Sequence, residues 1–266
     1  MGIISSGSTA YEKVKAARAS NRPTSSAYLS NIFSDFIELH GDRRFADDPA
    51  IIGGIAMLHG MPVTVIAIEK GKDLKDKVHR NFGAPNPEGY RKALRLMRQA
   101  EKFSRPVVCF IDTSGAFCGI GAEERGQGQA IAENLMELMT LKTPIVSILI
   151  GEGGSGGALA LGVADEVWIL ENAIYSVISP EGCASILWKD TAKVQEAAEA
   201  LRLTSADMKA LGIVERVFPE NGGDFASVYE CLQTALIEKL QALSSLPLTT
   251  LLENRYRRFR QFGTQK

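Results

Sequence analysis

Five glycines within seven residues mark the segment that most constrains this fold. They are Gly151, Gly153, Gly154, Gly156 and Gly157, and they follow the apolar, β-branched residues 145–150. Such a run predicts a buried strand, and the small apolar residues 158–164 predict a buried helix after the glycines. Glycine lacks a Cβ, so other groups can approach its backbone closely, and N–H groups at a helix start favour negative charge. The segment therefore predicts a strand exit that holds an anion or an oxyanion with its backbone.

The same pattern occurs one unit earlier in the chain. Residues 107–112 predict a strand that ends in the glycine turn TSGAFCGIG, and residues 127–141 predict the helix after it. Further strands are expected at 166–170 and 175–178, with a helix after the SPEG sequence at 179–182. Repeated strand–turn–helix units predict a layered α/β protein with parallel strands, which binds ligands where the strands end.

The flanking segments complete an expected three-part organisation. Apolar spacing predicts helices at 11–20, 26–40, 87–103, 205–211, 225–243 and 247–259, and strands at 51–58, 62–68 and 213–218. The turn His59-Gly60 joins the first two of these strands, Asn86 is the expected N-cap of helix 87–103, and residues 70–86 show no clean period. We expect a flexible or helical N-terminal segment at 1–24, one domain at 25–246 and a basic helical tail at 247–266.

Composition excludes several classes of function. The chain has 266 residues, 45% of them hydrophobic, and a net charge of −1, which argues against bulk attraction to nucleic acid or to an anionic membrane. No apolar run is long enough to span a bilayer, and the N-terminus lacks the pattern of a secretory signal. The four cysteines form no CxxC pair and have no nearby histidine, so no metal site is expected. These features fit the cytoplasm.

Three chemistries compete for the glycine turn. The spacing Gly151-x-Gly153-x-x-Gly156 with Glu171 twenty residues on matches a dinucleotide fingerprint weakly. The spacing around Ser155 matches the nucleophile elbow of hydrolases, but all three histidines lie upstream, at positions 40, 59 and 79. This order excludes the usual Ser–Asp–His sequence, although Ser155 with an upstream histidine or a lysine stays open.

The third chemistry needs no side-chain nucleophile. The turns at Gly115-Ala116 and Gly156-Gly157 each supply backbone N–H donors to an oxygen that gains negative charge. The alternative explanation of these residues is close packing of a helix on a strand. Two successive glycine turns raise the oxyanion interpretation to equal standing with the packing one.

Four long motifs resemble a known family. They are RNFGAPNPEGYRKALRLMRQAEKF at 80–103, GAEERGQGQAIAENL at 121–135, PIVSILIGEGGSGGALALGVAD at 144–165 and YSVISPEGCASILWK at 175–189. Over about residues 29–219 the chain resembles the α subunits of bacterial acetyl-CoA carboxylase carboxyltransferases. The resemblance implies an α/β, crotonase-like (ClpP/crotonase) spiral of repeated ββα units with helical N- and C-terminal extensions.

The resemblance also implies a reaction and partners. Such subunits transfer the carboxyl group of carboxybiotin, carried on the biotin carboxyl carrier protein, to acetyl-CoA and form malonyl-CoA, the first step of fatty acid synthesis. The active site is shared with a β subunit in an α2β2 heterotetramer, within a larger ATP-dependent complex that contains biotin carboxylase. No covalently bound cofactor is expected on this chain, and zinc is expected only on the β subunit.

The motifs carry specific site residues over to this sequence. Gly156 and Gly157, with Gly115 and Ala116, are the expected backbone donors to the biotin ureido oxygen. The expected substrate-binding residues are their neighbours and two members of the basic segment 70–98, namely Gly153, Gly154, Ser155, Phe117, Lys70 and Arg91. Which N–H of each pair faces the oxyanion is not encoded in the motif.

One turn departs from the family pattern. Where relatives of this family read DTPGAYPG, this chain reads DTSGAFCG at 112–119, without either proline and with Phe117 in place of tyrosine. Proline restricts the backbone, so its loss predicts a less preorganised turn. The departure leaves an alternative function open: a duplicated, pathway-dedicated or catalytically weakened homologue that uses another acyl-CoA, such as propionyl-CoA, or acts mainly by binding partners.

Overall fold

The computed structural model describes residues 8–264, which fold around one eight-stranded sheet in the order β1-β2-β3-β4-β5-β6-β8, with β7 paired to β5 off this path. The first three strands pair antiparallel, and the strands from β3 onward pair parallel. The strands are β1 Ser34–Glu38, β2 Ile51–Leu58, β3 Met61–Ile68, β4 Val107–Thr113, β5 Ile145–Gly154, β6 Glu166–Leu170, β7 Ile174–Ser176 and β8 Arg216–Phe218.

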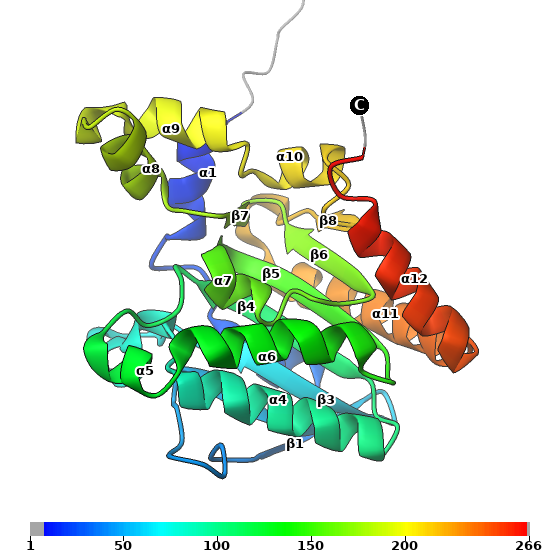
Figure 1. Ribbon diagram of the computed structural model, residues 1–266. Helices are drawn as coiled ribbons and strands as arrows, with labels where there is room; N and C mark the ends of the chain where they lie inside the picture. Colours follow the sequence, from blue (N-terminus) through cyan, green and yellow to red (C-terminus); the bar gives the residue numbers. More distant parts are fainter. Residues whose placement is uncertain (1–7, 265–266) are drawn as a thin grey trace, which may run out of the picture.

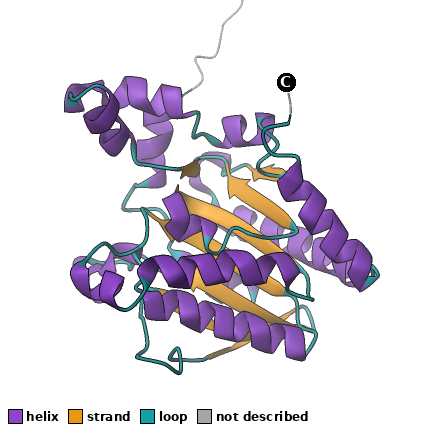
Figure 2. Cartoon of the chain, in the orientation of Figure 1, coloured by secondary structure: helices purple, strands orange, loops and turns teal. Residues whose placement is uncertain are grey.

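Helices cover both faces of this sheet (Figures 1 and 2). The helices are α1 Ala10–Ala17, α2 Ser25–Ile32, α3 Leu74–His79, α4 Pro87–Lys102, α5 Ile120–Glu124, α6 Gln127–Thr140, α7 Ser155–Leu159, α8 Pro180–Leu187, α9 Val194–Leu201, α10 Ser205–Ala210, α11 Phe225–Ser244 and α12 Leu248–Arg260. One face is covered by α4 and α6, and the other by α2 and α11. Because both faces are covered, β4 is buried along its whole length, as its continuous apolar run requires. The expected layered α/β architecture is confirmed.

The hairpin predicted at the start of the sheet is also confirmed. His59 and Gly60 join β2 to β3, with φ values of 47° and 81°. A two-residue turn with both φ values positive matches the right-handed twist of the flanking strands.

The helix predicted at 26–40 is wrong in its second half. α2 ends at Ile32, and Ser34–Glu38 forms the edge strand β1, which pairs with β2. Phe36 and Ile37 fit the helical spacing, but an apolar pair fits either period over so short a run. A Cβ at Gly54 would clash with the carbonyl of Ile37, so β2 has a glycine where β1 approaches.

Other boundaries differ where local signals are weak. The helix expected at 158–164 begins earlier and ends at Leu159, because β5 extends to Gly154 and α7 follows at once. Three helices were not predicted: α3, α5 and α9. They have eight residues or fewer, and too few turns for an apolar period to be recognised.

Arginines of α12 and of the segment after α1 fasten these outer parts of the described chain to its core. In α12, Arg255 is 1% exposed, bonds Asp165 at 2.7 Å and donates to the carbonyls of Leu138, Leu141 and Thr143. Near the N-terminus, Arg18 bonds Glu152 of β5 at 2.7 Å. The division at 24/25 and 246/247 stays a prediction. Within residues 8–264, no helix combines the length and the apolar character needed to cross a bilayer.

A buried carboxylate supports the start of α4. Asn86 is the N-cap without a side-chain hydrogen bond; instead its N–H donates to Asp48 Oδ2 at 2.6 Å, while Ala50 N–H donates to Oδ1 at 2.8 Å. Asp48 is 1% exposed, and burial raises its pKa to about 6, against the opposing effect of these two N–H donors and the Lys92 charge.

We expect Asp48 to make the stability of the fold depend on pH. Its pKa is higher in the folded chain than the unfolded value of about 3.9, so the folded state binds more protons between these values. Its contribution to stability therefore rises as pH falls from about 6 to 4. Urea unfolding should show that the free energy of unfolding of wild type, relative to that of Asp48→Asn, increases by about 2–3 kcal/mol when the pH falls from 7 to 4. A constant difference between the two proteins would contradict this.

Candidate active site

The two predicted glycine turns lie against each other at the ends of β4 and β5. These strands are parallel neighbours, and Thr113 pairs with Gly153 just before the turns. A Cβ at Gly154 would clash with the carbonyl of Ser114. A Cβ at Gly157 would clash with Ala116 N and lie 2.7 Å from Gly115 C. Glycine at 154 and 157 therefore lets the two backbones touch, and the structure brings all four predicted donor residues together.

Hydrogen bonds distinguish the N–H groups of the first turn. Gly115 N–H donates to Thr113 Oγ1 at 3.0 Å, and Phe117 N–H donates to the carbonyl of Pro85 at 3.0 Å. Between them, Ala116 N–H has no hydrogen-bond partner among residues 8–264. Of the pair Gly115 and Ala116, only Ala116 therefore has a backbone N–H that is free, within the described part of the chain, to bind an oxyanion.

The second turn leads directly into α7. Gly154 is the N-cap of α7 and provides no side-chain hydrogen bond. Because the helix begins at Ser155, Gly156 and Gly157 are its second and third residues. N–H groups in the first turn of a helix have no carbonyl partner within the helix. The carbonyl of Gly157 accepts a hydrogen bond from the buried Tyr90 hydroxyl at 3.2 Å. Gly156 and Gly157 therefore present N–H groups next to that of Ala116.

Side-chain hydrogen bonds stabilise the turn that lacks the family prolines. Thr113 Oγ1 accepts from Gly115 N–H and donates to the carbonyl of the same residue at 2.8 Å. Gln127 Nε2 donates to the carbonyls of Pro85 and Phe117, both at 2.9 Å. These bonds fix the backbone on both sides of Ala116 without proline. The Phe117 ring is 37% exposed and lies over Gly119.

The hydrolase and dinucleotide alternatives find no support in the geometry. Ser155 has a φ of 55°, as a strained strand-to-helix turn would give, but its hydroxyl bonds no histidine or lysine in the described part of the chain. Glu171, the acid of the dinucleotide interpretation, accepts a hydrogen bond from Glu220 N–H at 3.1 Å. The helix after the glycines has only five residues.

An irregularity in the pairing of β4 with β5 lies directly below the turns. Ile111 pairs with Leu149 and Thr113 with Gly153, so residues 150–152 of β5 face Asp112 alone. The Asp112 carboxylate occupies the space where Gly151 would carry a Cβ, and its Oδ1 accepts the N–H of Glu152 at 2.8 Å. This hydrogen bond links the two strands where their regular pairing is interrupted.

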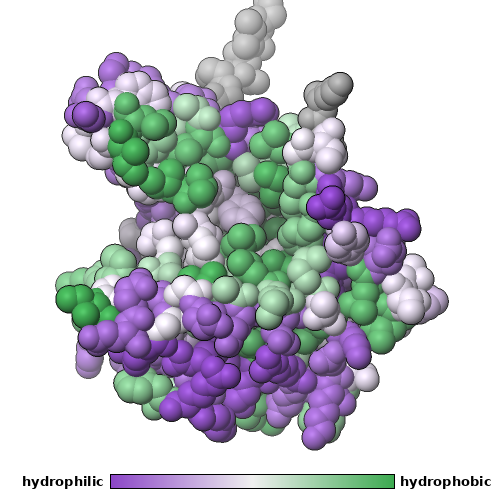
Figure 3. All heavy atoms as spheres, in the orientation of Figure 1, coloured by the Kyte–Doolittle hydropathy of each residue, from purple (hydrophilic) through white to green (hydrophobic). Residues whose placement is uncertain are grey.

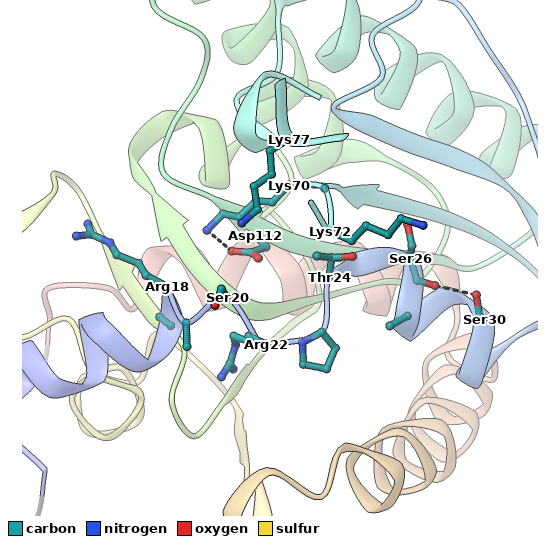
Figure 4. A pocket seen from close by; sticks show the side chains of 15 residues that line it. Arg18, Ser20, Arg22, Thr24, Ser26, Ser30, Lys70, Lys72, Lys77 and Asp112 are labelled. Carbon is teal, nitrogen blue, oxygen red and sulfur yellow. Dashed lines mark hydrogen bonds and ion pairs between the residues drawn. The ribbon is translucent and has the colours of Figure 1, made fainter. Parts of the chain in front are cut away.

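Lys70 neutralises this carboxylate. Its Nζ lies 2.7 Å from Asp112 Oδ1 and 2.8 Å from Glu152 Oε2 (Figure 4 shows Lys70 beside Asp112). Burial opposes the charge on Lys70, but the Asp112 and Glu152 carboxylates raise its pKa. The pKa of Glu152 is lowered by Lys70 and Arg18 in spite of burial, so Lys70 and Glu152 are both charged at neutral pH. Lys70, predicted to bind substrate, is thus next to the turns and engaged by two carboxylates.

Arg91, the other predicted basic residue, is not brought to the turns. Its Nε bonds Asp42 at 2.7 Å, and its Nη1 donates to the carbonyl of Arg125 at 2.9 Å. Other members of the basic segment 70–98 are likewise paired within the chain: Lys92 with Asp47, Arg80 with Asp76 and Arg98 with Glu137.

An apolar hollow beside the second turn was not predicted. It has a volume of about 520 Å³ and is bordered by Ser155, Gly156, Leu159, Tyr175, Val177, Leu201, Met208, Leu211, Ile213 and Phe262. Figure 3 shows apolar side chains on both sides of this hollow. Its walls run in sequence from Ser155 to Phe262, so no local pattern could reveal it. In residues 8–264 no group of three potential metal ligands occurs.

A mixed sheet whose parallel strands β4 and β5 end in two apposed glycine turns is the arrangement of a crotonase-like α/β protein. The chain belongs to the acetyl-CoA carboxylase carboxyltransferase family: the family described as acetyl co-enzyme A carboxylase carboxyltransferase-like matches residues 4–263. The acetyl-coenzyme A carboxylase carboxyl transferase subunit alpha of Ruminiclostridium cellulolyticum is 62% identical over 96% of this chain and 98% of its own. The same subunit of Streptococcus pyogenes is 59% identical over 94% and 97%, respectively.

Solved structures share the fold at low sequence identity. Transcarboxylase 12S matches 81% of this chain with a TM-score of 0.68 and 19% identity. The β subunit of Pseudomonas aeruginosa geranyl-CoA carboxylase matches 91% of this chain with a TM-score of 0.67 and 15% identity. This chain spans 41% and 46% of their respective lengths. A Pseudomonas malonate decarboxylase matches 80% with a TM-score of 0.61 and 21% identity. The crotonase-like fold expected from the motifs is confirmed.

Proposed function

We propose that this chain is the α subunit of an acetyl-CoA carboxylase carboxyltransferase, which transfers a carboxyl group from carboxybiotin to acetyl-CoA. The observation that carries the proposal is the pair of apposed turns, whose N–H groups at Ala116, Gly156 and Gly157 adjoin one another without a side-chain base. The relatives at 59–62% identity, named for this activity, support it.

The reaction needs what these turns offer. Loss of CO2 from carboxybiotin leaves a ureido oxyanion, and this anion removes a methyl proton from acetyl-CoA, so the chain need not provide a base. The thioester enolate then attacks CO2 to give malonyl-CoA. A preorganised donor to an oxyanion contributes about 3–4 kcal/mol of transition-state stabilisation where it has been tested by deletion. The N–H groups of Ala116, Gly156 and Gly157 are assigned as the donors to the ureido oxyanion. The residues assigned to the space around the biotin ring are Gly153, Gly154, Ser155 and Phe117.

A β-subunit interface is supported by exposed apolar side chains beyond the first turn, beside the second and on α8. Val177, Ile186 and Leu187 are 76%, 66% and 68% exposed, and Ile120 beyond the first turn is 80% exposed. Exposed apolar groups of this kind are typical of an interface. We assign this surface to a β subunit that carries the zinc and completes the site in an α2β2 assembly. The biotin carboxyl carrier protein delivers the substrate, biotin carboxylase completes the cytoplasmic complex, and this chain holds no cofactor of its own.

Reconstitution tests the proposal. The chain is combined with its β subunit and a carboxylated biotin carrier, and malonyl-CoA formation from acetyl-CoA is measured. We expect turnover only when both subunits are present, because half of the site is missing from each alone. An assembled complex without carboxyl transfer would refute the assignment.

The alternative drawn from the altered turn is not favoured. The hydrogen bonds of Thr113 and Gln127 hold the turn in place of proline, and the relatives are named for acetyl-CoA carboxylase. Supplying propionyl-CoA in the same assay checks this choice. We expect malonyl-CoA to form faster than methylmalonyl-CoA; the opposite order would make another acyl-CoA the substrate.

A further inference from the structure

Two arginine side chains that have no ion-pair partner among residues 8–264 lie in one hollow on the α4–α6 face. The hollow has a volume of about 340 Å³ and is lined by Asp42, Arg43, Arg44, Arg91, Leu94, Arg95, Arg98 and Glu133. These residues come from the loop before β2, from α4 and from α6. None of them belongs to the glycine turns, so this hollow is separate from the candidate active site.

Most charges in the hollow are already paired. Asp42 is bonded by Arg91 at 2.7 Å and also accepts backbone N–H groups of its own loop. Arg98 bonds Glu137 at 2.9 Å, and Arg44 lies 3.7 Å from Glu133. Asp47, just outside the hollow, bonds Lys92 and His40. The local carboxylates are therefore committed to other partners.

Arg43 and Arg95 are the exceptions. In the described part of the chain neither has a carboxylate within ion-pair distance, and each uses guanidinium N–H groups only on backbone carbonyls. Arg43 and Arg95 both donate to the carbonyl of His40, and Arg95 also donates to that of Gly41 at 3.0 Å. Burial and the neighbouring Arg43 charge lower the pKa of Arg95, against the opposing effect of the Asp47 and Asp42 charges. The shared carbonyl holds two like charges side by side.

We propose that Arg43 and Arg95 form a binding site for a phosphate monoester or diphosphate group of a small molecule. Two adjacent guanidinium groups match the double negative charge and the several oxygens of a phosphoryl dianion. A carboxylate carries only one negative charge and two oxygens, so it matches them less well. Fixing each guanidinium through a backbone carbonyl leaves its other N–H groups for the ligand. The hollow fits a small metabolite, and the overall charge of −1 disfavours a nucleic acid.

Direct binding tests the site with the full-length chain. Pyrophosphate and inorganic phosphate are titrated by calorimetry at low ionic strength, with acetate as the singly charged comparison. We expect pyrophosphate to bind more tightly than phosphate, acetate not to bind, and Arg43→Gln or Arg95→Gln to weaken binding at least about 10-fold. Arg260→Gln is the matched control, because Arg260 is exposed on α12 and lies outside the hollow.

Thermal unfolding separates lost binding from lost structure. Without ligand, Arg43→Gln should melt no lower than wild type, because it removes a like charge beside Arg95; with pyrophosphate, only wild type and Arg260→Gln should gain stability. CoA and dephospho-CoA then show whether a 3′-phosphate on a nucleotide is accepted as well as a free anion. Equal affinity of all variants, no binding of either inorganic probe, or preference for a single-stranded oligonucleotide over pyrophosphate would overturn the proposal.

Discussion

Replacing Gly157 by alanine is expected to lower carboxyl transfer by at least about 100-fold, the effect of losing one oxyanion donor. The new Cβ would clash with Ala116 N and would lie 2.7 Å from Gly115 C and 2.9 Å from the Tyr90 hydroxyl. Two of these three atoms belong to the backbone, which cannot rotate away. The turns must therefore separate, and the N–H groups of Ala116 and Gly157 lose their alignment.

The experiment compares two glycine-to-alanine variants in the reconstituted complex. Gly128→Ala is the control, because Gly128 is exposed in α6 and a Cβ there meets nothing within 4 Å. We expect Gly128→Ala to keep wild-type turnover, and Gly157→Ala to lose turnover while it still assembles with the β subunit. Wild-type turnover by assembled Gly157→Ala would show that the apposed turns are not the oxyanion site.

The predicted proximity of the two glycine turns depends on local pattern. Gly115, Ala116, Gly156 and Gly157 follow short, β-branched apolar runs that favour strands, and parallel neighbours end at the same edge of a sheet. Their proximity therefore followed from two strand–turn–helix units and a family resemblance. What the pattern could not specify was which N–H stays free, because that depends on Thr113 Oγ1 and on Pro85.

The parts that were missed depend on contacts between distant residues. Asp112 reads as the last residue of an apolar strand, and only the register of β4 against β5 reveals that its carboxylate spans the irregularity. Arg91 lies in one of the motifs that resemble the family, yet its side chain bonds Asp42 and does not approach the glycine turns. Edge strand β1 was mistaken for helix because five residues carry too little periodicity to distinguish the two.

Replacing Lys70 by methionine is expected to destabilise the fold by about 3 kcal/mol at pH 7, since removing one partner leaves buried charges uncompensated. Asp112 and Glu152 have side chains that are 7% and 10% exposed, and both bond Lys70. Arg18 still contacts Glu152, but the part of the chain described here offers Asp112 no other cation within ion-pair distance. Because Asp112 holds Glu152 N–H below the glycine turns, carboxyl transfer should fall as well.

The pH dependence of this loss has a definite sign. In wild type the pKa of Glu152 is lowered, so its pairing contributes stability above about pH 4.3 and loses it as pH falls through the folded pKa. The pKa of Lys70 is raised, so its contribution lasts up to about pH 10.4 and is lost above. Without Lys70 the Glu152 carboxylate accepts its proton at higher pH. The deficit of Lys70→Met should therefore be largest near pH 7 and shrink toward pH 4.

Two further variants separate charge from packing. Lys77→Met is the matched control, because Lys70 and Lys77 both line one cavity of about 400 Å³ and Lys77 has no ion pair within residues 8–264 (Figure 4). It should unfold like wild type at both pH values. Lys70→Met combined with Asp112→Asn removes the cation and one carboxylate together, while the amide oxygen can still accept Glu152 N–H. If charge balance is the cause, the double variant recovers stability relative to Lys70→Met; an additive loss would instead assign the effect to packing of the lysine chain.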